Sequence, residues 1–148
     1  MSLSPSQLTA LRSLLDRIIP ADDFPGALDA GTDTYVLRHL LGDCTAEAHV
    51  LLLGLSQLDA ETVARHGPYQ TFATLLPTQQ DALLADLAAA RPMTPWPPQL
   101  PAAPWFHRLV ELAHEGFYAD PANGGNRDAA SWGMLGYAPR TTPERAAP

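Results

Sequence analysis

The chain has 148 residues, of which 46% are hydrophobic and 17% are charged, so it can form one buried core and lacks the composition of a disordered protein. Its formal net charge is −7 and it contains no lysine, which argues against a surface that neutralises nucleic-acid phosphates. The single cysteine, Cys44, excludes an internal disulfide framework and a cysteine-rich zinc site.

Helical periodicity dominates the first half of the chain. A capping-box spacing at Ser4 opens the first predicted helix, and Ile19-Pro20 ends it because a residue before proline disfavours helical backbone. Leucines at intervals of three and four residues predict a second helix over 27–41 and a third over about 45–66.

The second half alternates helices with irregular segments. Residues 69–75 predict a short helical turn and residues 76–90 a helix. Residues 91–104 contain six prolines, so we expect an extended connector across the surface with Trp96 held in a groove.

The C-terminal third predicts a long helix over 104–118, a glycine-rich loop over 120–126 and a short helix over 128–135. No stretch alternates polar and apolar residues as a strand would. The sequence therefore predicts an all-α fold of five to six helices. We expect one domain over 1–137, followed by a flexible tail over 138–148.

The loop and the residues beside it form the densest group of glycine, asparagine and aromatic residues in the chain. From the residues alone a structural loop is favoured, and a loop that contacts a partner comes second. The candidate interface residues are Phe117, Tyr118, Asp120, Pro121, Asn123, Gly124, Gly125, Asn126, Arg127, Asp128, Trp132 and Tyr137.

No catalytic residue or resident metal is predicted, because the chain has neither a G-x-S-x-G motif nor a dinucleotide-binding fingerprint. His107, Glu111 and His114 share one helical face, and the last two have the Glu-x-x-His spacing of di-iron bundles. A second copy of that motif is missing, so a polar stripe is favoured. A metal-dependent enzyme using this face and a free-standing homodimeric interaction module are the alternatives.

Residues 115–137 resemble the C-terminal signature of the gluconate 2-dehydrogenase subunit 3 family, and residues 11–27 and 79–84 resemble other blocks of its pattern. The resemblance extends over about residues 8–137. It implies a non-catalytic accessory subunit that assists the folding, assembly or export of a larger enzyme. That partner would be a large FAD-containing oxidoreductase of the glucose–methanol–choline type, acting on sugars, sugar acids or alcohols. In some members a cytochrome c subunit joins the complex.

The N-terminus runs directly into a helical pattern and shows no signal peptide or twin arginine, which favours a cytoplasmic location. A periplasmic location is the alternative if a twin-arginine signal has been removed or if the partner carries one. The longest apolar run, residues 50–55, is too short to insert into a membrane.

Overall fold

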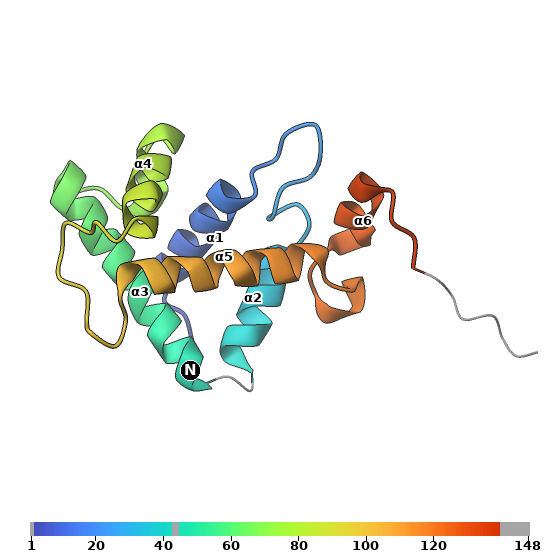
Figure 1. The fold of residues 1–148 in the computed structure, drawn as a ribbon, viewed down its shortest axis with the longest axis horizontal. Helices are drawn as coiled ribbons and strands as arrows, with labels where there is room; N and C mark the ends of the chain where they lie inside the picture. The colour runs from blue at the N-terminus through green and yellow to red at the C-terminus, as the bar shows by residue number, and fades with distance from the viewer. Residues whose placement is uncertain (1, 43–44, 140–148) are drawn as a thin grey trace, which may run out of the picture.

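The computed structural model describes residues 2–42 and 45–139, which fold into six α-helices and three short 3-10 turns (Figure 1). The described residues contain no strand, so the all-α prediction is confirmed. Cys44 and residues 140–148 of the expected tail lie outside the described part. The helices are α1 (Pro5–Ile18), α2 (Thr32–Leu41), α3 (Thr45–His66), α4 (Pro77–Ala88), α5 (Ala102–Tyr118) and α6 (Ala130–Leu135); the 3-10 turns are η1 (Phe72–Thr74), η2 (Pro121–Asn123) and η3 (Arg127–Ala129).

Helix α5 organises the fold, because it runs across the molecule and contacts all five other helices (Figure 1). Its Trp105 is buried in the core, and the indole Nε1 donates a hydrogen bond to the Leu51 carbonyl oxygen of α3 at 3.1 Å. Gly54 makes room for this ring. A Cβ atom at Gly54 would lie only 1.9 Å from Trp105 Nε1. The glycine inside α3 therefore allows α5 to pack closely against α3 at this point.

The second helix begins at Thr32 and not at Ala27 as the spacing predicts. After α1 the chain folds back on itself, and the Ala27 amide donates to the Ile19 carbonyl oxygen at 2.8 Å. A Cβ atom at Gly26 would lie 2.5 Å from the Ala21 nitrogen, so glycine is required at this close approach. Residues 27–31 therefore form the end of this reversal and a turn that ends at Gly31, whose φ is +71°, and they are not part of the helix.

The other helix boundaries differ from the predictions by a few residues. Helix α5 begins at Ala102, two residues early, because Pro104 is tolerated in a first turn. Helix α6 begins at Ala130 because Asp128 and Ala129 have left-handed backbone conformations. None of the described helices combines the length and the hydropathy that a bilayer crossing requires.

The proline-rich connector is fixed by the buried carboxylate of Glu61 on α3. Glu61 accepts hydrogen bonds from the backbone amides of Met93 and Thr94 at 3.0 and 2.7 Å and from Trp96 Nε1 at 3.2 Å. Arg65 Nε lies 3.3 Å from the same carboxylate. Trp96 packs against Trp105, with 5.2 Å between the ring centroids. The expectation that Trp96 is held in a groove is therefore confirmed.

Replacement of Glu61 tests this anchor. Burial alone raises the pKa of Glu61, but the hydrogen bonds from Thr94, Met93 and Trp96 outweigh it and hold the pKa below its ordinary value. A carboxylate whose pKa is lowered by folding stabilises the fold at any pH above its ordinary, unfolded-state pKa. This stabilisation is lost as the pH falls through the folded-state pKa. We expect Glu61→Gln to lower the free energy of unfolding by about 2–3 kcal/mol at neutral pH.

Urea denaturation between neutral and acidic pH measures both effects. The Glu61→Gln variant should lose less stability on acidification than the wild type, because it lacks the titrating group. The exposed Asp23 provides the control, and Asp23→Asn should match the wild type at neutral pH. Equal stability of Glu61→Gln and wild type at neutral pH would contradict the anchoring role.

The end of α4 offers a second test. The Arg91 and Ala90 amides donate to the carbonyl oxygens of Asp86 and Leu87, the hydrogen-bond pattern of a Schellman motif, and Ala90 occupies the left-handed position with φ +56°. Alanine is strained there and glycine is not. Ala90→Gly should therefore raise the free energy of unfolding by about 1 kcal/mol in urea denaturation. Ala89→Gly, at φ −86°, should not stabilise the fold; the same gain from both variants would refute the strain at Ala90.

Candidate partner interface

The glycine-rich loop is tied to the rest of the chain by Asn126. This side chain is buried, and its Nδ2 donates to the Ala119 carbonyl oxygen at 2.9 Å. Its Oδ1 accepts from the backbone amide of Ser131 at 2.9 Å and from the Ser131 hydroxyl at 2.7 Å. One amide group therefore joins the end of α5 to the start of α6 across the loop.

Close backbone packing holds the loop against α5. A Cβ atom at Gly125 would lie 2.1 Å from the Gly116 carbonyl oxygen, and one at Gly116 would lie 2.7 Å from Tyr35 Cδ1. The loop thus stacks on α5, and α5 stacks on α2, through two glycines. The Arg127 amide completes the contact by donating to the Ala30 carbonyl oxygen at 2.7 Å.

Three of the twelve candidate interface residues are buried inside the chain itself: Phe117, Gly125 and Asn126. Their interpretation as partner contacts is corrected, because a partner cannot reach them without opening the fold. Burial follows from the return of the chain onto α5, which the order of residues alone does not reveal.

The other nine candidates are accessible to different extents. Asp120 accepts a hydrogen bond from the Ala122 amide at 2.9 Å and so starts η2. Trp132 is half-buried, and its Nε1 donates to the Tyr118 carbonyl oxygen at 3.1 Å. The residues that reach the surface are Tyr118, Asp120, Asn123, Arg127, Asp128 and Tyr137, with Pro121, Gly124 and Trp132 half-buried.

Three of these nine residues are aromatic, and together with His114 of α5 they make up what we call the C-terminal aromatic cluster: His114, Tyr118, Trp132 and Tyr137. The cluster consists of two ring pairs, which the hydrogen bond from Trp132 to the Tyr118 carbonyl oxygen joins. The His114 and Tyr118 rings are stacked with an interplanar angle of 5°, and Tyr137 meets Trp132 edge to face at a centroid distance of 5.2 Å. Tyr118 and Tyr137 are 42% and 56% exposed. Leu135, 62% exposed, lies one helical turn after Trp132 and extends the apolar surface.

Sequence analysis missed three residues of this region. His114 was interpreted as part of a polar stripe, with a metal ligand as the alternative, and its ring stacks on that of Tyr118. Leu135 was counted as the end of a helix. Arg38, on α2, was not considered, although its guanidinium lies against Gly124. Leu37 and Leu41 of α2 lie beside the buried face that carries Val36 and Leu40, and this excess of apolar residues is the sequence signal for a second apolar face on the helix.

The face with His107, Glu111 and His114 is exposed. Glu111 accepts a hydrogen bond from Arg108 at 3.2 Å, and His114 Nδ1 lies 2.8 Å from the Val110 carbonyl oxygen. Nowhere in the described ranges do three histidine, cysteine, aspartate or glutamate side chains gather as metal ligands. The geometry gives no support to the metal-dependent alternative.

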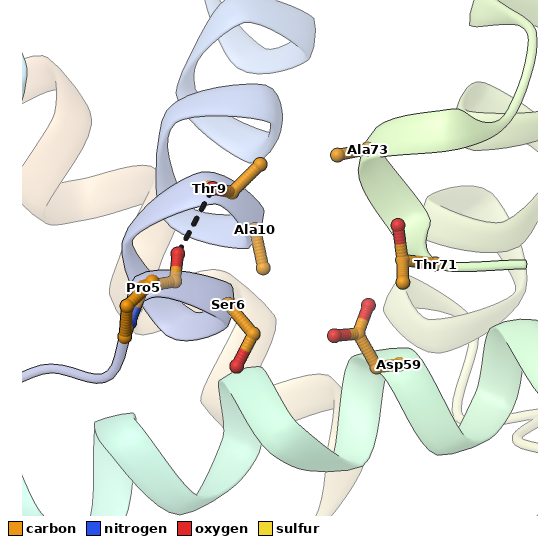
Figure 2. Close-up of a pocket in the computed structure, with 7 residues that line it drawn as sticks. All are labelled: Pro5, Ser6, Thr9, Ala10, Asp59, Thr71 and Ala73. Carbon is orange, nitrogen blue, oxygen red and sulfur yellow. Dashed lines mark hydrogen bonds between the residues drawn. The ribbon is translucent and has the colours of Figure 1, made fainter.

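A cavity of about 230 Å³ lies between α1, α3 and η1 (Figure 2). Figure 2 shows the hydroxyls of Ser6, Thr9 and Thr71 and the carboxylate of Asp59 at its wall. Asp59 Oδ1 accepts a hydrogen bond from the Phe72 amide at 2.9 Å, and the Thr9 hydroxyl donates to the Pro5 carbonyl oxygen at 2.9 Å. These groups serve the local backbone, and the lining contains no histidine, cysteine or lysine to activate a hydroxyl.

The model of the family "Gluconate 2-dehydrogenase subunit 3" matches residues 5–139. The chain belongs to this family. Searches of curated proteins and of solved structures found no match. The match covers all six helices, including the loop built around Asn126. The sequence resemblance is therefore confirmed, and the family is named for a subunit of a dehydrogenase.

The internal role of Asn126 in this family member gives a third test. Asn126→Ala removes three hydrogen bonds and leaves the buried Ser131 groups unpaired, so we expect the free energy of unfolding to fall by about 2–4 kcal/mol. Asn123→Ala is the matched control: its side chain is exposed, and the change should be below about 0.5 kcal/mol. Thermal and urea denaturation measure both, and equal effects would assign Asn126 to the surface.

Proposed function

We propose that this chain is a non-catalytic accessory subunit that binds a large FAD-containing oxidoreductase of the glucose–methanol–choline type. The partner holds the FAD and oxidises sugars, sugar acids or alcohols. The small chain stabilises the folded, flavin-loaded form of its partner. Membership of a family named for a dehydrogenase subunit supports the class of partner.

The observation that carries the proposal is the C-terminal aromatic cluster together with Leu135. Tyrosine and tryptophan are enriched among the residues that contribute most to protein interfaces. Here the indole of Trp132 is fixed by its hydrogen bond to Tyr118, and Tyr137 is held against it. Aromatic groups that are already ordered lose little conformational entropy when a partner binds.

Stabilisation of the partner follows from mass action. A subunit that binds the folded flavoprotein and not the unfolded chain raises the stability of the folded form in proportion to the logarithm of its concentration over Kd. This mechanism needs an interface and no catalytic group. It accounts for an accessory chain that exposes Tyr118, Leu135 and Tyr137 at its C-terminal end.

Affinity capture of the tagged full-length chain from its native cells tests the proposal. The eluate should contain a large flavoprotein in near-equal amount, identified by mass spectrometry and flavin absorbance, and it should oxidise a sugar or alcohol. Recovery of a colourless chain alone, or of a homodimer alone, would overturn the proposal.

Substitution of the cluster gives the fourth prediction. Tyr118→Ser combined with Tyr137→Ser should weaken binding to the purified flavoprotein by roughly 10-fold or more, because two exposed anchors are removed. Tyr69→Ser is the control: Tyr69 is 95% exposed and lies after α3, away from the C-terminal segment. Affinity and thermal melting are both measured, so loss of binding is distinguished from loss of fold. Equal affinities for the two variants would remove the cluster from the interface.

A further inference from the structure

The outer side of α2 carries a shallow groove of about 400 Å³ lined by Thr34, Leu37, Arg38, Leu41 and Gly42. These residues recur at intervals of three and four, so they share one face of the helix. Leu41, the last residue of α2, is 48% exposed. The groove is therefore an apolar strip with one cation, Arg38, along its length.

Arg38 differs from most arginines of this chain. Of the seven arginines in the described ranges, five lie within 4.0 Å of a carboxylate: Arg12, Arg17, Arg65, Arg91 and Arg108. Arg38 and Arg127 have no such partner among the described residues. In a chain of net charge −7, two guanidinium groups in one region without a carboxylate partner in ranges 2–42 and 45–139 are unusual.

Both guanidinium groups lie on glycines that join α2 to the glycine-rich loop. A Cβ atom at Gly124 would lie 2.7 Å from Arg38 Nη1, and one at Gly31 would lie 3.1 Å from Arg127 Nη2. Gly124 has φ +99° and Gly31 has φ +71°, so both positions also favour glycine by conformation. Each guanidinium group therefore lies where the missing side chain of a glycine leaves room for it.

The two guanidinium groups belong to segments that meet at α2. Arg127 reaches Gly31, directly before α2, and Arg38 stands on α2 itself. Arg38 also lines the groove, together with Thr34, Leu37, Leu41 and Gly42. A complementary surface would carry carboxylates for the guanidinium groups, with apolar side chains beside them.

We propose that the groove on α2, with Arg38 and Arg127, docks an acidic segment of the large dehydrogenase subunit. This inference rests on the proposed function for the existence of that partner. Charge complementarity selects the occupant: guanidinium groups form bidentate hydrogen bonds with carboxylates, and both are unpaired among the described residues. The leucines of the groove bury the apolar side chains of the same segment.

Binding measurements with the purified large subunit give the fifth prediction. Arg38→Gln and Arg127→Gln should each weaken binding by roughly 10-fold, and Arg38→Glu should weaken it further through repulsion. The wild-type affinity should fall as salt is raised, and the variants should show a smaller salt dependence. Arg91→Gln is the control, because Arg91 is exposed, follows α4 in the chain and pairs with Asp86 of that helix.

The outcomes separate the two proposals. If the wild type does not bind the large subunit, the proposed function fails. If the wild type binds and the Arg38 and Arg127 variants bind equally well, the docking site on α2 is overturned while the accessory role stands. If the same variants change self-association of the chain and leave partner binding unchanged, a second copy occupies the groove, and this inference also fails. Thermal melting of each variant should match the wild type, since neither guanidinium group hydrogen-bonds to a described residue.

Discussion

The fold depends on the contact between Trp105 and Gly54. One missing side chain on α3 lets α5 approach closely enough for an indole to reach a helix carbonyl, that of Leu51. Trp96 then packs on Trp105, and the buried carboxylate of Glu61 fixes the connector that leads into α5. With α5 placed in this way, its last turn is available at Gly116 for the loop that follows. The position of the C-terminal region is thus set by packing that begins on α3.

Within a few residues, the C-terminal segment contains buried side chains that attach it to the fold and exposed side chains that are available for contact. Asn126 and Gly125 face inward and attach the loop to α5, whereas Tyr118, Tyr137 and Leu135 face outward. The inward residues specify where the outward ones stand. The same division recurs beside α2, where glycines form the support and arginines face solvent. A loop that is held by internal hydrogen bonds and presents exposed side chains is suited to contact with a partner.

Helical periodicity and prolines were sufficient to predict the fold class, six helical segments and the pinned Trp96. They were insufficient for contacts that join distant segments. Nothing in the sequence around Gly116 requires a glycine inside this helix, and only the close approach of the Tyr35 ring explains why a glycine stands there. Asn126 lies in a segment whose composition is typical of a surface loop, but its side chain is buried. The side-chain amide hydrogen-bonds to the Ala119 carbonyl oxygen after α5 and to the Ser131 amide at the start of α6, which would otherwise lack these partners. Arg38 was overlooked because its lack of a carboxylate partner among the described residues becomes visible only when those residues are placed in space.

The hydrogen bond from the Arg127 amide to the Ala30 carbonyl oxygen has a consequence for biosynthesis. It joins a residue near the start of the chain to one near its end, and α5 must be in place before it can form. During synthesis, the apolar side chains of α1 to α4 that pack against α5 therefore remain exposed until the C-terminal third of the chain has been made. Long-range closure of this kind slows folding and prolongs the exposure of apolar side chains. The nascent chain is accordingly expected to engage chaperones that bind such surfaces, before it can assist any partner.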